Sequence, residues 1–123
     1  MKNLPLILYI DDNTDSCEIL EILMRRRGFE VISRHSAAEA LNDARNKAFS
    51  AVVSEYVLSD IDAIELCCEL RKINPDKPIV FYTTEARNEH KQRGLLAGAK
   101  AFLVKPNDLE SIEKTIADIA LSD

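Results

Sequence analysis

Side chains that can do chemistry follow the apolar segments of this sequence, each at the point where a segment ends. These side chains are Asp11, Asp12, Glu55, Thr83, Thr84 and Lys105. Three carboxylates held close together repel one another, and a hard divalent cation relieves that repulsion. An ammonium and hydroxyls that face them suit the anionic oxygens of a phosphoryl group. The residue types therefore predict a weak site for Mg²⁺ or Mn²⁺ beside a phosphoryl site.

The apolar segments that position these residues are short and rich in β-branched residues, as strands are. They cover residues 4–10, 29–33, 51–54, 79–84 and 101–105. Longer segments of helical period lie between them. This alternation predicts right-handed crossovers and a doubly wound α/β domain, with a five-stranded parallel sheet and five helices. In such a sheet the functional crevice lies at the carboxyl ends of the strands, where these side chains fall.

The helices between the strands have recognisable ends. The first is expected to stop at Gly28, and the second to open at Ser36 with Glu39 as its capping-box partner. The third is expected to open at Asp62. The fourth, expected within 85–99, is polar and contains a glycine, so we expect it to be the least stable helix.

The composition limits the classes of function. With 46% hydrophobic content, the chain is expected to fold as one domain over residues 1–123. Its apolar runs are well short of the ~20 residues of a membrane span, so we expect a cytoplasmic protein without membrane contact. A net charge of -5 disfavours direct binding to nucleic acid. The cysteines lack a C-x-x-C spacing, which predicts reduced core thiols; they are Cys17, Cys67 and Cys68.

Three stretches of the sequence together match a known family. They are the acid pair in LYIDDN, the strand and loop in IVFYTTEA, and AGAKAFLVKP with its final Lys-Pro. In this order and at these strand ends, they resemble the CheY-like receiver domain of two-component response regulators. The resemblance covers essentially the whole chain. It implies the flavodoxin-like strand order 2-1-3-4-5.

The resemblance also implies a role for each residue of the constellation. Asp11 and Asp12 would bind magnesium together with Glu55 and the backbone carbonyl of Val57. Thr83 would be the switch hydroxyl, with Thr84 as its neighbour. Phe102 would be the aromatic switch, and Lys105 would be the lysine that pairs with a phosphoryl group. The bond between Lys105 and Pro106 is expected to be cis, as it is in this family.

Glu55 falls on the position where the family has its phosphoacceptor aspartate. The family's usual proline and glycine later in this loop are replaced by Ser59 and Ala63, so the loop has diverged as a unit. One extra methylene displaces the carboxylate by ~1 Å or more, which costs in-line transfer about 10²-fold. The longer side chain also carries its charge toward Thr83 and Lys105, as a partial mimic of a phosphoryl group. Ordinary aspartyl phosphorylation is therefore not expected.

The leading hypothesis is a non-enzymatic receiver module of a phosphorelay that changes its binding surface. Its expected partners are a sensor histidine kinase or phosphotransfer protein, and an output protein on the fourth helix, fifth strand and fifth helix. One alternative is a phosphatase-like hydrolase of the haloacid dehalogenase type, but that type requires D-x-D, and Asn13 follows Asp11 at the second position. Another is a phosphorylation-independent protein-interaction domain. Turnover of a phosphate ester would identify the hydrolase, and Mg²⁺ titration would separate the other two.

The site residues also have ordinary structural interpretations. Taken alone, the pair Asp11-Asp12 is more typical of a helix cap than of a metal site. Thr83 alone is typical of a strand, and Phe102 alone is typical of a core. The combination of these acids with Glu55 and a lysine at successive strand ends favours a site.

Other polar residues are expected to have structural roles. His35 and His90 belong to no readable motif, so we expect both to be exposed. The basic run 25–27 would offset the dipole of the first helix rather than bind phosphate. Asp60 would be a solvated loop residue.

Overall fold

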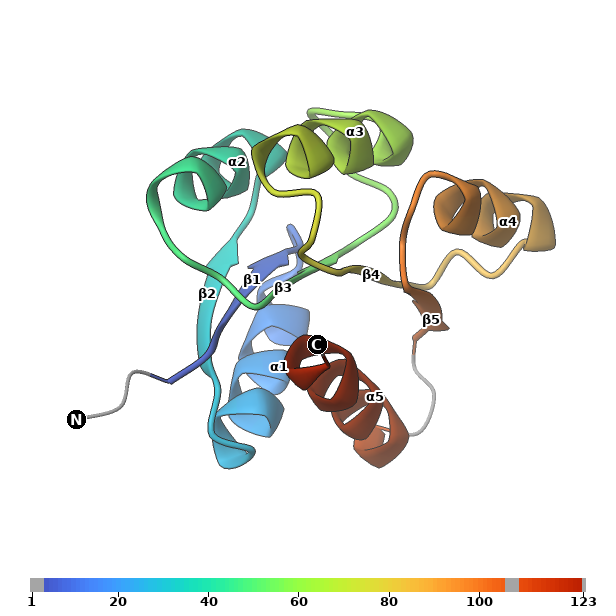
Figure 1. The fold of residues 1–123 in the computed structure, drawn as a ribbon. Helices are drawn as coiled ribbons and strands as arrows, with labels where there is room; N and C mark the ends of the chain where they lie inside the picture. The colour runs from blue at the N-terminus through green and yellow to red at the C-terminus, as the bar shows by residue number, and fades with distance from the viewer. Residues whose placement is uncertain (1–3, 106–108, 123) are drawn as a thin grey trace.

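A five-stranded parallel sheet forms the centre of the molecule (Figure 1), in a computed structural model that describes residues 4–105 and 109–122. The strands are β1 (Leu6–Ile10), β2 (Glu30–Arg34), β3 (Ala51–Ser54), β4 (Ile79–Thr83) and β5 (Ala101–Val104). Their order in the sheet is β2-β1-β3-β4-β5, and every neighbouring pair is parallel. The predicted doubly wound α/β fold with strand order 2-1-3-4-5 is confirmed.

In the described part of the chain, five helices cover the two faces of this sheet. They are α1 (Thr14–Arg26), α2 (Ala37–Asn46), α3 (Ala63–Ile73), α4 (Asn88–Leu96) and α5 (Leu109–Leu121). Helices α1 and α5 lie on one face, and α2, α3 and α4 lie on the other (Figure 1). Each of the helices α1 to α4 returns the chain to the edge where the next strand begins. The carboxyl ends of the strands therefore share one edge of the sheet, and the helices end at the opposite edge.

Side-chain alternation along the strands divides the core between the two faces. In β1, Leu8 and Ile10 pack in the cluster that α2 and α3 cover, whereas Ile7 and Tyr9 pack in the cluster that α1 and α5 cover. Strands β1, β3 and β4 are buried along their whole length, as expected for parallel strands covered on both faces. This packing fixes the carboxyl ends from which the predicted site residues project.

The predicted ends of the first three helices are confirmed. Ser36 accepts a hydrogen bond from the Glu39 amide (3.3 Å) at the start of α2. Asp62 accepts one from the Ile64 amide (3.1 Å) at the start of α3. After α1, Gly28 has φ +89°, a left-handed conformation that glycine adopts without a steric cost.

Asp60 is exposed in its loop, as predicted, but it also has a structural role. Its two carboxylate oxygens accept hydrogen bonds from the amides of Ala37 (3.2 Å) and Ala38 (3.1 Å), at the start of α2. Negative charge at a helix start is favoured by the free amides and the helix dipole. Asp60 therefore ties the loop after β3 to α2, in a contact between segments more than 20 residues apart.

The basic run at the end of α1 has the structural role predicted for it. Arg25 and Arg26 lie in the last turn of the helix, where positive charge offsets the dipole. Arg26 and Arg27 also pair with Glu113 of α5, at 3.5 and 3.4 Å. The run therefore joins α1 to α5 on their shared face of the sheet.

Three other expectations have different outcomes. Cys17 and Cys67 are buried, but Cys68 is exposed, because it lies one position round the helix from the face of α3 that packs on the sheet. The fourth helix is shorter than the expected segment 85–99. Pro106, and with it the bond predicted to be cis, lies outside the described residues.

Within residues 4–105 and 109–122, every helix is too short or too polar to cross a membrane.

Candidate functional site

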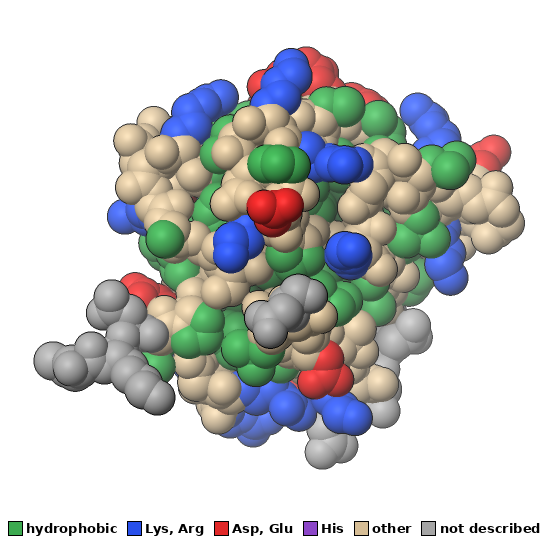
Figure 2. All heavy atoms as spheres, in the orientation of Figure 1, with side chains coloured by type: hydrophobic (Ala, Val, Ile, Leu, Met, Phe, Trp, Pro, Cys, Tyr) green, Lys and Arg blue, Asp and Glu red, His purple; other side chains and the backbone are tan. Residues whose placement is uncertain are grey.

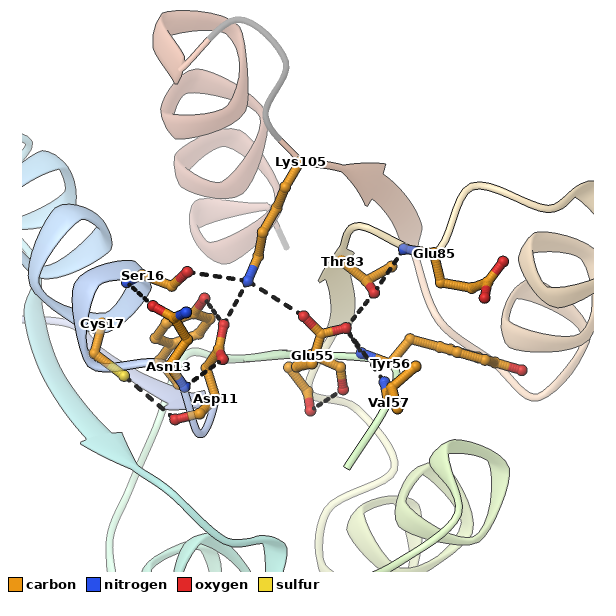
Figure 3. A network of polar contacts seen from close by, with 12 residues as sticks. Asp11, Asn13, Ser16, Cys17, Glu55, Tyr56, Val57, Thr83, Glu85 and Lys105 are labelled. Carbon is orange, nitrogen blue, oxygen red and sulfur yellow. Dashed lines mark hydrogen bonds and ion pairs between the residues drawn. The ribbon is translucent and has the colours of Figure 1, made fainter. Parts of the chain in front are cut away.

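Four of the predicted site residues come together at the carboxyl edge of the sheet (Figure 3). Asp11 follows β1, Glu55 follows β3, Thr83 ends β4 and Lys105 follows β5. Because these strands are parallel and β3 lies between β1 and β4, the side chains leave the sheet toward a common point. Hydrogen bonds and ion pairs connect all four.

The ammonium of Lys105 lies between two carboxylates. Its Nζ is 2.5 Å from Asp11 Oδ2 and 3.2 Å from Glu55 Oε2, and it donates to Ser16 Oγ at 3.2 Å. The centroid of the Tyr82 ring lies 5.1 Å from Nζ, a cation–π distance. Burial lowers the pKa of Lys105, but the hydrogen bond and charge of Asp11 and the charge of Glu55 outweigh it and raise that pKa. Lys105 therefore stays charged at neutral pH.

Both carboxylate oxygens of Glu55 accept hydrogen bonds. Oε1 accepts from the hydroxyl of Thr83, which is fully buried. The same oxygen accepts from the amides of Tyr56 (2.9 Å) and Val57 (3.2 Å), and Oε2 accepts from Lys105. The side chain of Glu55 is only 12% exposed. Its carboxylate therefore joins the ends of β3, β4 and β5 and is held by four donors.

Asp11 is also fully engaged, in part by a residue that the sequence analysis missed. Its Oδ2 accepts from the Tyr9 hydroxyl at 2.7 Å in addition to Lys105, and its Oδ1 accepts from the Asn13 amide at 2.9 Å. Burial raises the pKa of Tyr9 strongly, and the hydrogen bond to Asp11 raises it further, so the phenol is a neutral donor. Tyr9 precedes Asp11 by two positions, and alternation places such residues on one face. That spacing is the sequence signal for the pair.

The predicted metal ligands are not gathered into a coordination site. In residues 4–105 and 109–122, no three His, Cys, Asp or Glu side chains are grouped so that they could hold a metal ion. Asp12 is exposed and lies outside the network, and the Val57 amide donates to Glu55. The ammonium of Lys105 forms ion pairs with both Asp11 and Glu55, and its single positive charge offsets one of their two negative charges. In this arrangement a divalent cation would have to compete with Lys105 for Asp11 and Glu55.

The remaining predicted residues make none of the polar contacts described above. Thr84 is exposed. Phe102 is buried, with its ring centroid 5.4 Å from that of Tyr56 and 6.0 Å from that of Phe81. A Cβ at Gly94 of α4 would lie 3.2 Å from the Phe81 ring and 3.3 Å from the Phe102 ring. Helix α4 therefore approaches this aromatic cluster closely because residue 94 is glycine.

His90 of α4 is not the exposed residue that was predicted, whereas His35 is exposed. The His90 ring is half-buried, with Nδ1 3.3 Å from the Tyr56 hydroxyl and its centroid 5.3 Å from that of Tyr56. Tyr56 follows Glu55 and donates its amide to the Glu55 carboxylate. The contact between His90 and Tyr56 therefore links α4 to the site. The two residues are 34 positions apart in the sequence, so no local sequence pattern predicts this contact.

Comparisons with known proteins agree with this arrangement. Residues 7–117 match the response regulator receiver domain family. The transcriptional regulatory protein ZraR of Salmonella typhimurium is 33% identical over 110 residues, which cover 89% of this chain and 25% of ZraR. The transcriptional regulatory protein PrrA of Mycobacterium tuberculosis is 32% identical over 102 residues, which cover 83% of this chain and 44% of PrrA. The chain thus spans less than half the length of these relatives.

Solved receiver structures have the same fold. A CheY-like receiver domain protein of Methanospirillum hungatei matches with a TM-score of 0.88 and 26% identity, over 96% of this chain and 94% of that one. The non-phosphorylated HemR receiver domain of Leptospira biflexa matches with a TM-score of 0.88 and 27% identity, over 97% and 96%. This chain therefore belongs to the response regulator receiver domain family, and it is a receiver module of two-component signalling.

Proposed function

We propose that this receiver module is atypical, with the Glu55 carboxylate in the place that a phosphoryl group takes in other receivers. The observation that supports this most is that the Thr83 hydroxyl and the Lys105 ammonium both bind that carboxylate. These are the two donors that the family resemblance assigns to a phosphoryl group. We therefore expect the switch hydroxyl and the lysine to be engaged without phosphorylation.

The same contacts disfavour ordinary phosphorylation. An acceptor carboxylate attacks phosphorus in line, so one of its oxygens must be free and correctly positioned. Here Oε1 accepts from three donors and Oε2 accepts from Lys105. The extra methylene of glutamate also moves the carboxylate toward Thr83 and Lys105. Glu55 is therefore expected to be a poor phosphoacceptor.

The mimicry is expected to be partial. A carboxylate carries about -1 on two oxygens, whereas a phosphoryl group carries about -1.5 to -2 on three. Receiver domains interact with histidine kinases and output partners. For this chain we propose a protein partner that binds the surface formed by α4, β5 and α5. That surface would stay in a single state. Nucleic acid would have no direct role. A sensor histidine kinase or phosphotransfer protein is a further candidate partner.

Receiver domains typically bind Mg²⁺ at the phosphorylation site, but here a cation would compete with Lys105. Asp11, Asp12, Glu55 and the Val57 carbonyl remain the predicted ligands. Because Lys105 already pairs with Asp11 and Glu55, we expect Mn²⁺ titration, followed by proton relaxation, to reveal only weak binding. Lys105→Met should strengthen that binding, and a further Asp12→Ala change should weaken it again. Tight binding by the unaltered protein would contradict this proposal.

Labelling with a small phosphodonor tests the role of Glu55. The unaltered protein, incubated with acetyl phosphate and Mg²⁺, should gain no acid-labile phosphoryl group by mass spectrometry. Glu55→Asp should be labelled at least slowly, because the shorter side chain withdraws from Thr83 and frees an oxygen. Ser59 and Ala63 are expected to keep that rate low.

The matched control is Glu55→Gln, which keeps the side-chain length and removes the charge. It should stay unlabelled, so that labelling of the aspartate variant reports acceptor chemistry rather than loosening of the loop. Ready labelling of Glu55 in the unaltered protein would overturn the proposal. Receiver domains are generally signalling modules rather than enzymes, and we expect no turnover of a phosphate ester by any of the three proteins.

A further inference from the structure

A hollow of about 420 Å³ lies at the opposite edge of the sheet from the site, where helices end and strands begin. The end of α3, the loop into β4 and the loop into β5 form its walls. Three cations, Arg71, Lys77 and Lys100, line it together with one acid, Asp76. Figure 2 shows basic side chains around an acidic one on this face, over the loops that lead into the strands. The hollow is therefore net positive in a chain whose net charge is -5.

The guanidinium of Arg71 is held at one wall of this hollow. One of its amino groups donates to the carbonyl of Ala97 at 3.3 Å. A Cβ at Gly98 would clash with the guanidinium, so the group packs directly on the glycine backbone. Gly98 also has φ +113°, a conformation that favours glycine. A guanidinium has five N–H donors, and this placement leaves most of them available to a ligand.

Lys77 and Lys100 supply two further charges from separate segments. Lys77 precedes β4, and Lys100 directly precedes β5. Among the described residues neither lysine pairs with a carboxylate, although acids outnumber basic residues in the chain. Asp76 of the same hollow also has no cation within ion-pair distance in that part of the chain. The two ammonium groups are therefore free to bind an anion.

We propose that this hollow binds a phosphate-bearing small molecule through Arg71, Lys77 and Lys100. A guanidinium presents a fork of donors that matches phosphate oxygens, and lysines add point charges. The amides of Asp76 and Lys77 already donate to Asn74, so side chains must supply the contacts. A ligand with at least two negative charges is required, because Asp76 repels anions. A hollow of this size suits a small molecule, whereas nucleic acid requires an extended basic stripe.

The cations have one simpler explanation, which the test must exclude. Positive charge near the end of a helix offsets its dipole, and Arg71 lies in the last turn of α3. That role accounts for the contact of Arg71 with Ala97 but not for the two lysines, which lie outside helices. A dipole role predicts effects on unfolding, whereas a binding site predicts effects on affinity.

Titration with inorganic pyrophosphate tests the proposal. Calorimetry and amide chemical shifts at about 0.05 M salt should reveal one saturable site, with shifts centred on Lys77, Gly98 and Lys100. The double variant Lys77→Gln/Lys100→Gln should bind about tenfold or more weakly, because it loses two charge-assisted contacts. Asp76→Asn should bind more tightly, because it removes the acid that lines the hollow.

The matched control is Lys91→Gln/Lys114→Gln, which makes the same change in net charge on α4 and α5, outside the lining of the hollow. It should bind pyrophosphate as the unaltered protein does. All substituted side chains are exposed, so the variants are expected to stay folded, which circular dichroism would verify. Equal weakening in both double variants, or the absence of a saturable site in the unaltered protein, would overturn the proposal. Labelling at Glu55 has no bearing on this outcome.

Discussion

Lys105 reaches Asp11 across the sheet: its Nζ lies 2.5 Å from Asp11 Oδ2, although β3 and β4 separate the strands from which the two residues extend. Strands β1 and β5 share no backbone hydrogen bonds, so this ion pair is a direct connection between them. The Lys105 side chain is 11% exposed and that of Asp11 is 1% exposed. Because water screens such a pair weakly, its loss should affect stability more than the loss of a surface pair.

Lys105→Met should lower the free energy of unfolding at pH 7 by about 2 kcal/mol, because it leaves Asp11 and Glu55 as close buried carboxylates without a counter-ion. Urea unfolding followed by circular dichroism would measure this change. Lys91→Met removes an exposed lysine of α4 and is the control, with an expected change near zero. An equal loss of unfolding free energy in both variants would mean that the contacts of Lys105 with Asp11 and Glu55 do not stabilise the fold.

The difference between the unaltered protein and Lys105→Met should also depend on pH. The contacts with Asp11 and Glu55 raise the pKa of Lys105 in the folded state. The folded state therefore holds this proton more tightly than the unfolded chain does, and the stabilisation is complete below the ordinary lysine pKa of about 10.4. It should be lost as the pH rises through the higher pKa of the folded state. A difference that stays constant up to pH 11.5 or so would contradict this assignment.

An ion pair between β2 and α2 should produce acid sensitivity. Arg34 Nε lies 2.6 Å from Asp43 Oδ2, and a second guanidinium nitrogen lies 3.2 Å from Oδ1. The hydrogen bond from Arg34 lowers the pKa of Asp43, although burial opposes it. The pair thus stabilises the fold above the usual aspartate pKa, and this stabilisation is lost as the pH falls through the lower folded pKa.

Asp43→Asn should therefore cost about 1–2 kcal/mol at pH 7, after allowance for the partial exposure of Arg34. The cost should shrink at a second, acidic pH, as the pH falls below the usual aspartate pKa of about 3.9 and through the lower pKa of the folded state. Unfolding in urea at both pH values would test this. Glu69→Gln, which breaks an exposed pair with Lys72, should have little effect at either pH. A cost that does not change with pH would contradict the role of the Asp43 charge.

Gly94→Ala should destabilise the protein although alanine is the better helix former. The substitution gains up to about 1 kcal/mol in helix propensity. Its Cβ, however, would lie 3.2 Å from the Phe81 ring and 3.3 Å from the Phe102 ring, and overpacking of a core costs about 1–3 kcal/mol. We expect a net loss of roughly 1 kcal/mol by chemical denaturation, whereas Gln92→Ala, at an exposed position of α4, should be neutral or slightly stabilising. A net gain from Gly94→Ala would mean that α4 moves away from the rings at little cost.

The fold was predictable because its signals are local. Apolar segments predicted all five strands, and the segment 51–54 coincides with β3. The capping residues Ser36 and Asp62 predicted the starts of α2 and α3. Helix α4 was less well predicted: the helix buries one residue, Gly94, so no apolar period marks its boundaries.

The site was predictable in part, for the same physical reason. Parallel strands bring their carboxyl ends to one edge, so Glu55 and Lys105 were expected to meet there, and they do. The interactions with Tyr9 and His90 were missed. The first depends on a hydroxyl in an otherwise apolar strand, and the second on the tertiary packing of α4 against Tyr56. The second contact is set by how elements pack and not by the spacing of residues within one element.

Helix α4 should exchange its amide hydrogens faster than α5 does. Helix α4 has no side-chain cap at Arg87 and buries only Gly94, whereas α5 buries Ile112 and Ile116 among other residues. Local opening of α4 therefore exposes less apolar surface and costs less free energy. Hydrogen exchange measured by NMR should give protection factors in α4 at least tenfold below those in α5, and equal protection would contradict this prediction.

His90→Ala should raise exchange in α4 further, because it removes the contact of His90 with the Tyr56 hydroxyl and ring. The loss of one hydrogen bond and one ring contact amounts to about 1–2 kcal/mol, or roughly tenfold in the opening equilibrium. Lys91→Ala changes a neighbouring exposed side chain and should leave exchange in α4 nearly unchanged. Exchange in β1 and β3 should be the same in both variants, since local opening of α4 leaves those strands covered by the other helices. If His90→Ala instead raises exchange throughout the molecule, His90 contributes to global stability. That result would contradict a specific role of His90 in holding α4 against the segment that carries Glu55.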